Sequence, residues 1–525
     1  MGGYDAIVIG AGHNGLVTAA YLARAGRKVL VLEQRDMVGG ATVTEEIVPG
    51  FKFSVFSYVV SLLRPQIIEE LELARHGLHL LALDGTFTPL PDGRSLARWH
   101  DGETTRRELR RFSPRDADQY PRFGLHMHHM ARAVRDLLMT RPPEPASLRP
   151  RDLAGLAWLA RHFGRLGERR VHDLVRLMTS SAADYLDRWF ETDPLKATMS
   201  ASGIIGTFLS PRSPGSAYVL LHHYMGEIDG VSRSWGFARG GMGSVANALA
   251  SAAKGFGAEV RTGAPTAKIL TRGGRARGVA LASGEEIEAK AVASSLDPRR
   301  TFLGLLDASE LPAEFVADVR RYRYRGSSGK VNLALGELPD FRCLPGDGPH
   351  LRGSISISPS MAYLERAYDE AKYGRFSSRP YMDVLIPSTI DPTMAPPGKH
   401  VMSIFVQYAP YHLKDGTWEE KREAFGDAVV DTLAEYAPNL KGAIVGRQVV
   451  TPWDMEKTIG LTEGNIFHGE LTLEQLFFLR PVPGWAQYRT PVRGLYLCGS
   501  GAHPGGGVMG APGRLAALEM LGRRR

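Results

Sequence analysis

A glycine-rich turn between a strand and a helix near residue 10 most constrains what this chain can fold into. The apolar residues 6–9 predict a short buried strand, and apolar residues at helical spacing from Leu16 predict a helix. The turn between them reads Gly10-Ala-Gly12-His-Asn-Gly15. Gly10 permits the tight turn, Gly12 lets the backbone approach a pyrophosphate, and Gly15 lets the helix pack against the strand. The free amides of the helix N-terminus would then point at the phosphates.

The glycine spacing alone is weak evidence, because the chain has 59 glycines and residues 505–510 fit the same pattern without a strand before them. The copy near residue 10 differs because a second predicted strand, residues 28–33, follows it and ends in Glu33. A carboxylate at this place is typical of one that binds the ribose hydroxyls of an adenosine. The pattern therefore predicts a dinucleotide-binding fold rather than an ordinary strand, turn and helix.

A second glycine pair, Gly39-Gly40, indicates which dinucleotide is bound. The backbone there passes close to something bulky, which FAD lying extended across the sheet would supply and a nicotinamide cofactor would not. A plain turn is the alternative. We therefore predict FAD, and the residues of this region that we expect to contact it are Gly10, Gly12, His13, Asn14, Gly15, Glu33, Gln34, Arg35, Gly39, Gly40, Ala41 and Thr42.

The last 30 or so residues are predicted to return to the cofactor. Residues 494–498 read as a short strand, and Gly499-Ser-Gly501 follows at its carboxyl end, where open α/β sheets bind ligands. A glycine-rich loop and a helix from about 511 to 521 come next, and that helix would aim its positive end at the flavin. A mere turn is again the alternative. The further contacts that we expect are Gly499, Ser500, Gly507, Val508, Met509 and, from an internal strand, Thr266.

Changes of pattern along the chain divide it into two domains. We predict a Rossmann-type FAD-binding domain from residues 1–70, 236–305 and 484–525. A second, substrate domain with helices and a mixed sheet is predicted from residues 71–235 and 306–483, with strands near 330–335, 382–386 and 401–407. The expected fold class is therefore α/β (α+β).

The net charge of +8 is concentrated in a basic helical segment, residues 94–170, which has 17 Arg and no Lys against 9 Asp and Glu. This segment lacks interleaved aromatic residues and any zinc or helix-turn-helix pattern, so we do not expect nucleic acid as a partner. One predicted helix near 151–166 is apolar on one side and carries Arg151, Arg161 and Arg165. It could lie on an anionic membrane surface, and an ordinary surface helix is the alternative.

Several classes of protein are disfavoured by what the chain lacks. No apolar run approaches the length of a membrane span, and no signal-peptide pattern opens the chain, so we expect a cytoplasmic protein, with peripheral membrane contact left open. Cys343 and Cys498 are the only cysteines and have no CxxC spacing, which argues against a redox disulfide. His126, His128 and His129 lack the HExxH spacing and a nearby carboxylate, so no metal site is expected.

Longer blocks of sequence resemble the phytoene-desaturase-related FAD oxidoreductases, and within them the branch of the pyridine nucleotide-disulphide oxidoreductase domain-containing proteins. These blocks are residues 10–16, 220–226, 235–243, 386–398, 464–469 and 495–510. The resemblance implies a two-domain flavoprotein similar to amine oxidases and carotenoid desaturases, with non-covalent FAD and substrate entering beside the isoalloxazine. It implies no particular substrate. The disulphide part of the family label finds no paired cysteines here.

A desaturase of this kind needs a flavin to accept a hydride at N5 and a base to accept a proton. The candidate bases are His468, Glu470 and His503, with His222 and His223 as weaker candidates, and each of them could instead hold a loop by hydrogen bonds. We expect oxidation of an apolar, isoprenoid or lipid-like small molecule. Because no second nucleotide fold is evident, oxygen or a quinone-type acceptor is expected to take the electrons.

Three other functions remain open on the sequence alone. A flavin amine oxidase would need an aromatic cage facing the flavin, which sequence cannot place. A flavoprotein with mainly a scaffold or partner role would carry FAD for structure alone. A flavin-dependent isomerase would show no net redox change. The oligomeric state is not predicted.

Overall fold

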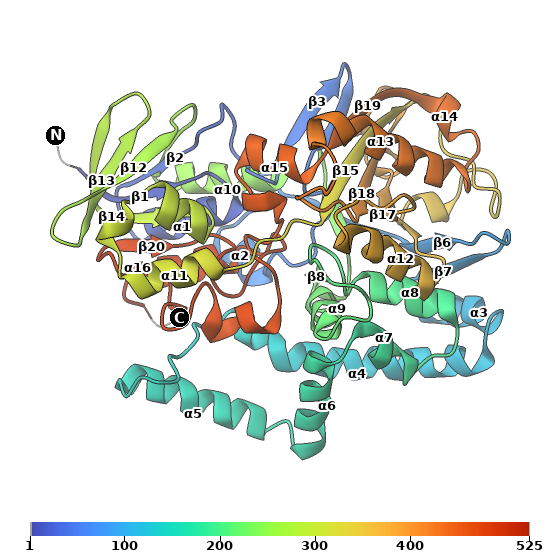
Figure 1. Ribbon diagram of the computed structural model, residues 1–525, viewed down its shortest axis with the longest axis horizontal. Helices are drawn as coiled ribbons and strands as arrows, with labels where there is room; N and C mark the ends of the chain where they lie inside the picture. Colours follow the sequence, from blue (N-terminus) through green and yellow to red (C-terminus); the bar gives the residue numbers. More distant parts are fainter. Residues whose placement is uncertain (1–2, 524–525) are drawn as a thin grey trace.

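The computed structural model describes residues 3–523. Two seven-stranded sheets stand side by side, and a group of helices lies along one edge of both (Figure 1). The remaining short strands form two-stranded sheets: β3 (Thr44–Val48) with β4 (Phe51–Ser54), β5 (Leu80–Ala82) with β10 (Gly236–Ala238), and β8 (Glu227–Ile228) with β9 (Val231–Ser232).

The first sheet has β1 (Tyr4–Ile9) near its centre. Its order is β11-β2-β1-β14-β13-β12, and β20 pairs with β14. Strands β1, β2, β11, β14 and β20 pair in parallel, whereas β12, β13 and β14 form an antiparallel meander. The bounds are β2 (Val29–Leu32), β11 (Glu259–Arg261), β12 (Thr266–Thr271), β13 (Ala276–Leu281), β14 (Glu286–Ser294) and β20 (Leu495–Leu497).

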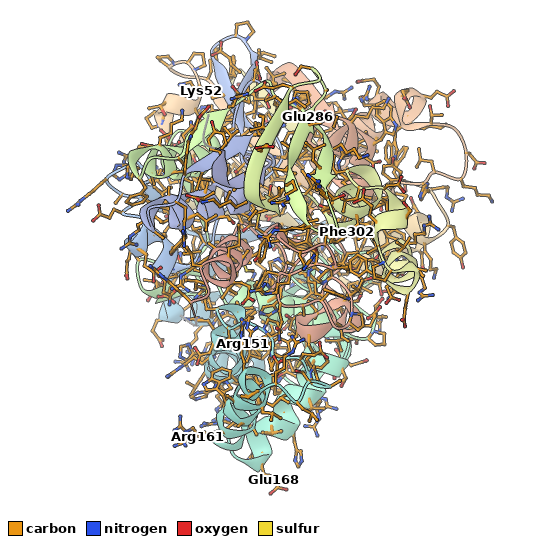
Figure 2. The ribbon with its side chains drawn as sticks, turned by 90° about the vertical axis from the view of Figure 1, so that its left-hand side faces the viewer. Lys52, Arg151, Arg161, Glu168, Glu286 and Phe302 are labelled. Atoms are coloured by element: carbon orange, nitrogen blue, oxygen red, sulfur yellow. The ribbon has the colours of Figure 1, made fainter. Side chains whose placement is uncertain are left out.

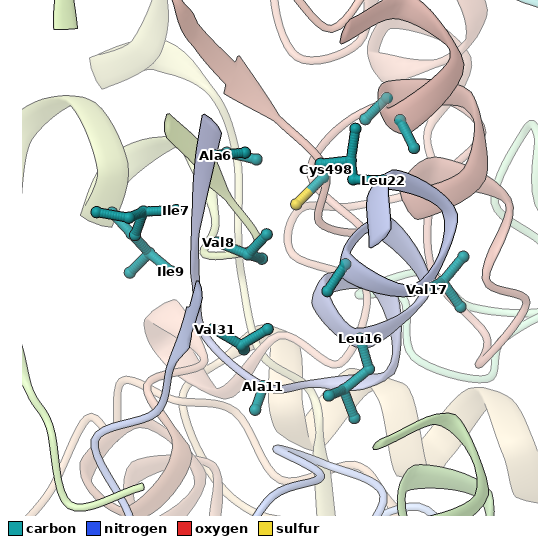
Figure 3. Packing of buried hydrophobic residues seen from close by; sticks show 14 of the residues in the cluster. Ala6, Ile7, Val8, Ile9, Ala11, Leu16, Val17, Leu22, Val31 and Cys498 are labelled. Carbon is teal, nitrogen blue, oxygen red and sulfur yellow. The ribbon is translucent and has the colours of Figure 1, made fainter. Parts of the chain in front are cut away.

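Both faces of β1 are buried, which explains its continuous apolar sequence. Ala6 and Val8 point toward α1 (His13–Arg24), while Ile7 and Ile9 point to the opposite side (Figure 3). Helices α10 (Gly243–Gly255) and α16 (Ala511–Met520) pack beside α1. Residues from both ends of the chain therefore share one core with the middle of the sequence.

The second sheet is mixed, as predicted. Its order is β19-β15-β18-β17-β16-β6-β7, and only the β16–β6 pair is parallel. The bounds are β6 (Gly85–Pro89), β7 (Ser95–Trp99), β15 (Ser328–Leu335), β16 (Ser354–Ile357), β17 (Tyr381–Leu385), β18 (His400–Gln407) and β19 (Ile444–Val450). Helices α12 (Met361–Lys372), α13 (Trp418–Ala434) and α14 (Leu440–Ala443) lie against this sheet, and α15 (Pro452–Ile459) follows β19 (Figure 1).

The basic segment, residues 94–170, is helical from residue 102 and forms the lower layer in Figure 1, whereas its residues 95–99 form β7 of the second sheet. Its helices are α3 (Gly102–Arg110), α4 (Pro114–Leu138), α5 (Pro150–Gly164) and α6 (Glu168–Thr179), followed by α7 (Ala182–Asp187), α8 (Asp193–Ala201) and α9 (Ser216–Tyr224). Helices α5 and α6 extend away from the two sheets, with Arg161 and Glu168 near the tip (Figure 2). Among residues 3–523, no helix has the length and apolar character needed to cross a membrane.

Two further helices lie with the first sheet. Helix α2 (Pro65–Glu70) and helix α11 (Ala313–Arg321) contribute Ile67, Phe315 and Val319 to the same core as β1. Helix α11 therefore packs on the nucleotide-binding side, although it follows residue 305, the predicted boundary of that domain.

Candidate functional site

One cavity of about 740 Å³ runs from the glycine-rich turn to the space between the two sheets. We call its first part the nucleotide end. The predicted cofactor residues that line it are Gly10, Gly12, His13, Asn14, Glu33, Gln34, Arg35, Gly40, Ala41, Thr266, Ser500, Gly507 and Val508. They come from three distant parts of the sequence, and β1, β2, β12 and the segment after β20 bring them together.

The three glycines of the first turn have different roles in the structure. Gly10 has a φ of +89°, which disfavours any other residue. A Cβ atom on Gly15 would lie 2.1 Å from the carbonyl oxygen of Gly10, so Gly15 permits close packing inside the protein. A Cβ atom on Gly12 would meet no atom within 4 Å. Gly12 therefore leaves space in the cavity itself, where a pyrophosphate would need it.

Five predicted cofactor residues lie behind the lining and support it. Gly39 donates its N–H to the carbonyl of Ala11 at 2.9 Å, and the hydroxyl of Thr42 donates to the carbonyl of Gly39 at 2.8 Å. The others are Gly15, Gly499 and Met509. For these residues the structure shows packing roles, and contact with a cofactor stays a prediction.

Glu33 lies at the end of β2 with its carboxylate fixed. One oxygen accepts from the N–H of Ala11 at 2.8 Å, and the other accepts from the N–H of Arg35 at 3.0 Å. The carboxylate thus joins the first glycine turn to the segment after β2. Its position matches that of a group that binds ribose hydroxyls in nucleotide-binding sheets.

Buried polar atoms without a protein partner test whether FAD fits here. They include His13 Nε2, Asn14 Oδ1, Arg35 Nη1 and Thr266 Oγ1, all from residues of the nucleotide end. Buried polar atoms in proteins are nearly always paired, so their gathering in one cavity indicates a polar ligand. Donors and acceptors of this kind suit phosphates, ribose hydroxyls and a heterocycle, and the residues present therefore fit FAD.

The other part of the cavity, the apolar end, is lined mainly by hydrocarbon and aromatic side chains. They are Phe56, Tyr58, Leu62, Ile205, Trp235, Phe405, Leu461, Ile466 and Phe467. Tyr58 and Phe405 stack with their ring centres 5.7 Å apart. This composition suits a ligand with a hydrocarbon surface.

Lys330 is a charged residue type placed among these apolar groups. It projects from β15, its side chain is 1% exposed, and its ammonium nitrogen donates to the carbonyl of Ser54. The nitrogen lies 5.4 Å from the ring centre of Tyr58. Burial lowers the pKa of Lys330 well below its ordinary value, because it penalises the charged ammonium.

Of the three main candidate bases, His468 is the one that lines the cavity. Asn465 fixes its loop, because the amide oxygen of Asn465 accepts from the N–H groups of Phe467 at 3.0 Å and Gly469 at 2.9 Å. Burial lowers the pKa of His468, and Nδ1 has no protein partner. A neutral imidazole facing the cavity can accept a proton.

Comparison with known proteins decides the family. The family described as flavin containing amine oxidoreductase matches residues 15–518. The chain belongs to this family. Its members are flavin-dependent oxidoreductases, and the site described above fits the flavin that the family implies.

Individual relatives agree with this assignment. The chain is 44% identical over 538 residues to pyridine nucleotide-disulfide oxidoreductase domain-containing protein 2 of Rattus norvegicus, covering 98% of this chain and 92% of the relative. It is 28% identical to a subunit of the limonene dehydrogenase of Castellaniella defragrans, covering 98% and 93%. The rat relative confirms the branch that the sequence blocks predicted.

A solved structure confirms the predicted amine-oxidase-like fold. Putrescine oxidase, in a structure titled as bound to putrescine, superposes with a TM-score of 0.61 at 18% sequence identity, covering 99% of each chain. At this identity the likeness concerns the fold.

Three other predicted bases of this flavin-containing oxidoreductase, Glu470, His503 and His222, lie outside the cavity lining. Glu470 is fully buried and pairs with Arg325, whose Nη2 donates to Oε2 at 2.7 Å. His503 Nε2 lies 2.9 Å from the carbonyl oxygen of Leu137, and His222 Nε2 lies 3.3 Å from that of Gly506. The contacts of these three residues therefore agree with the alternative role, in which each side chain holds a loop by hydrogen bonds.

His223 faces the cavity instead. Its Nδ1 lies 2.8 Å from the carbonyl oxygen of Val219, and its ring stacks on Trp235. Burial lowers the pKa of His223 to about 4, so it is neutral at physiological pH.

Cys343 and Cys498 are both free in the structure, and Cys498 is buried. Burial raises the pKa of Cys498 to about 12, which makes it an inert thiol of the core. In the part of the chain that the structure describes, no group of three His, Cys, Asp or Glu side chains is arranged to hold a metal ion.

Sequence reasoning missed two residues of this site, Lys330 and Arg480. Arg480 is fully buried and donates to the carbonyls of Phe467, Gly469, Glu470, Gln475 and Ser500. It thereby joins the loop of His468 to the segment after β20. The signal for Lys330 was a lysine in a strand whose neighbours are apolar; Arg480 lies in no regular pattern that would mark it.

Proposed function

We propose that this protein is an FAD-dependent dehydrogenase or desaturase of an apolar substrate with isoprenoid or lipid-like character. The observation that carries the proposal is the single cavity in which a polar nucleotide end continues into an apolar end. Bound FAD would supply the acceptor for a hydride taken from a substrate C–H bond. The relative whose name is that of a limonene dehydrogenase supports a hydrocarbon substrate.

The residues of the chain would divide the work between binding and proton transfer. Glu33, Arg35, Thr266 and the glycine turn would hold FAD without a covalent bond. The apolar end would orient the substrate and exclude water. Loss of a hydride from one carbon and a proton from the next leaves a double bond, so one proton must go to a base.

Lys330 is the base that we favour, with His468 as the alternative. The uncharged amine of Lys330 can accept the proton at Nζ and become an ammonium that remains hydrogen-bonded to the carbonyl of Ser54. His468 faces the same cavity with an unpaired nitrogen. Substitution of each residue in turn separates the two.

The electrons would leave to oxygen or to a quinone-type acceptor. The expectation rests on the sequence, in which only one nucleotide-binding fingerprint opens a strand, turn and helix. We therefore expect NADPH to reduce the FAD-loaded protein slowly. Stopped-flow mixing under nitrogen measures this, and rapid bleaching of the flavin would contradict it.

A flavin amine oxidase is the second candidate function. The aromatic side chains Tyr58, Trp235 and Phe405 at the apolar end, together with the family's description, favour it. A protein in which FAD is only structural, and an isomerase without net redox change, are the remaining alternatives.

One experiment distinguishes these functions. The purified protein should be yellow and should release FAD on denaturation. Under nitrogen it is then mixed with unsaturated and saturated terpenoids, long-chain lipids and amines, and the flavin absorbance is followed. Bleaching by a terpenoid or lipid with loss of two hydrogens supports the proposal. Bleaching by amines alone supports the amine oxidase, an isomeric product of unchanged mass supports the isomerase, and no bleaching by any compound supports a structural flavin.

A further inference from the structure

A second cavity, of about 570 Å³, adjoins the first. Val59, Ile205, His223 and Trp235 line both cavities, so the second one lies next to the apolar end of the first. It is bounded by β6, β7, α4, α9 and the segment after β9. We call it the arginine cavity, because Arg98, Arg106 and Arg233 line it.

Two of these three arginines lack a carboxylate partner. Arg106 pairs with Glu103 and Asp118, both at 3.0 Å. Within residues 3–523, by contrast, no Asp or Glu forms an ion pair with Arg98 or Arg233. Arg98 Nε is buried without any protein partner. Positive charge of this kind is costly to enclose unless an anion balances it.

The polar groups near Arg98 and Arg233 are either uncharged or already hydrogen-bonded to other residues. The guanidinium of Arg233 lies 4.5 Å from the ring centre of Tyr224, whose hydroxyl is buried without a partner. Asp383, a carboxylate in the lining, accepts from the hydroxyls of Tyr58 and Ser354, and burial raises its pKa. Both of its oxygens are thus already engaged by hydroxyl groups.

Tyr120, in the same lining, is affected by both arginines. Burial raises the pKa of its hydroxyl, but the positive charges of Arg98 and Arg233 lower that pKa by more, so the net shift is downward. The other two tyrosines of the lining, Tyr224 and Tyr381, are buried, and burial raises the pKa of each.

We propose that the arginine cavity binds an anionic head group, a carboxylate or a phosphate, of a substrate whose apolar chain extends into the cavity beside the flavin. Arginine is suited to this, because its planar fork pairs with both kinds of oxyanion through two parallel hydrogen bonds. The hydroxyls of Tyr224 and Ser202 are further donors in the lining. The inference deepens the proposed function: the substrate is an amphipathic acid rather than a pure hydrocarbon.

The test measures binding rather than turnover. The FAD-loaded protein is titrated with decanoate, decyl phosphate and 1-decanol at pH 7.5, and tryptophan fluorescence is followed, since Trp99 and Trp235 line the arginine cavity. We expect at least one of the two anions to bind about tenfold more tightly than the alcohol of the same chain length. The tighter of the two identifies the head group.

Variants locate the site. Arg98→Gln and Arg233→Gln should each remove the preference for the anion and leave the affinity for 1-decanol unchanged. Arg94→Gln, which changes an exposed arginine paired with Asp92 just before β7, should keep the preference. Thermal unfolding of each variant shows whether it is folded. Because the wild-type comparison of anion and alcohol needs no variant, it decides the question even where a variant is unstable.

Equal binding of all three probes by the wild type would overturn the inference, as would a preference that survives both substitutions. The proposed function fails in a different way, through a flavin that no lipid or terpenoid reduces. An anion preference together with an inert flavin would keep the head-group site and refute the dehydrogenase. Rapid flavin reduction by an apolar compound, with no preference for the anions, would support the dehydrogenase and refute the head-group site.

Discussion

At the scale of single residues, the position of Lys330 makes the most specific chemical statement. A lysine in a strand interior normally exposes its ammonium, yet this one is enclosed with a backbone carbonyl as its only hydrogen-bond partner among the described residues. Burial disfavours the charged ammonium, so a larger share of this amine is uncharged and able to accept a proton than on an exposed lysine. A catalytic role for Lys330 requires that the substrate release a proton within reach of its amine.

We expect Lys330→Met to slow flavin reduction by the substrate about 100-fold or more, because a positioned base contributes that much. The pH profile gives the diagnostic result. Burial lowers the pKa of Lys330, so the wild-type rate should rise as pH increases through that lowered pKa and be constant above it. The variant should lose this rise. The measurement is the rate of anaerobic flavin bleaching from pH 5 to pH 9.

Lys399→Met is the matched control, since Lys399 is exposed near the end of the second sheet, and its rate should equal that of the wild type. A Lys330→Met protein with normal rates and an unchanged pH profile would rule out Lys330 as the base. His468→Gln would then be the variant expected to show the loss.

Substitutions at Gly12 and Gly15 are expected to have different effects, one on cofactor binding and the other on folding. Gly12 has an ordinary φ of −67° and open space beside it, so Gly12→Ala should leave the thermal unfolding of the FAD-free protein unchanged. Its methyl group would occupy the space of a pyrophosphate, and FAD affinity should fall about tenfold or more. Gly15→Ala should instead unfold the FAD-free protein, because of the 2.1 Å contact with the Gly10 carbonyl. Equal effects of both changes on the FAD-free protein would contradict this division.

At the scale of elements, the loop of His468 has no helix or strand to position it and depends on Arg480. The guanidinium bonds carbonyls on both sides of the cavity, from Phe467 to Ser500. An ammonium group has one nitrogen instead of three, so Arg480→Lys leaves several buried carbonyls without a donor.

We therefore expect Arg480→Lys to lower the free energy of unfolding by about 3 kcal/mol, since hydrogen bonds from a charged donor are among the stronger ones and buried orphans add to the loss. Urea unfolding measures it. Arg272→Lys, at an exposed turn, should change stability by less than about 0.5 kcal/mol. A loss for Arg480→Lys as small as that of the control would show that the loop is positioned by packing alone.

Local patterns predicted the elements that line the nucleotide end of the cavity. Strand β1, its turn and α1 follow one another in the sequence, so glycine spacing and apolar periodicity were sufficient to find them. Lys330 was not found, because its role depends on Ser54 and Tyr58, which belong to a distant segment. The arginine cavity was not found either: Arg98 and Arg233 face one space only because β7 and the segment after β9 meet in three dimensions. Pairing of remote segments leaves no periodic trace in the sequence.

At the scale of the whole molecule, the projection formed by α5 and α6 is the main departure from a closed shape (Figure 1). Asp152 is the only fully buried residue of α5, and Leu153 is 47% exposed. Arg151 anchors the start of the helix through Glu519, which is buried on α16. We propose that the projection contacts an anionic membrane surface, through which an amphipathic substrate would arrive.

The double variant Arg161→Glu/Arg165→Glu tests this proposal. Each basic residue near an anionic bilayer contributes about 1 kcal/mol, so reversing two should reduce vesicle binding by more than about tenfold. Cosedimentation with vesicles of phosphatidylcholine and phosphatidylserine measures it at low salt. Arg320→Glu on α11, away from the projection, is the control. Absence of wild-type binding to these vesicles would contradict the proposal.

The insertion of β20 beside β14 has a consequence for how the protein is made. Asn14 Nδ2 donates to Ser500 Oγ at 3.0 Å, and the hydroxyl of Thr18 donates to the carbonyl of Gly513 at 3.0 Å. Segments almost 500 residues apart in the sequence therefore have to meet before this core is complete. Until β20 and α16 are present, β14 lacks one of its strand partners and α1 lacks one of the two helices that pack beside it.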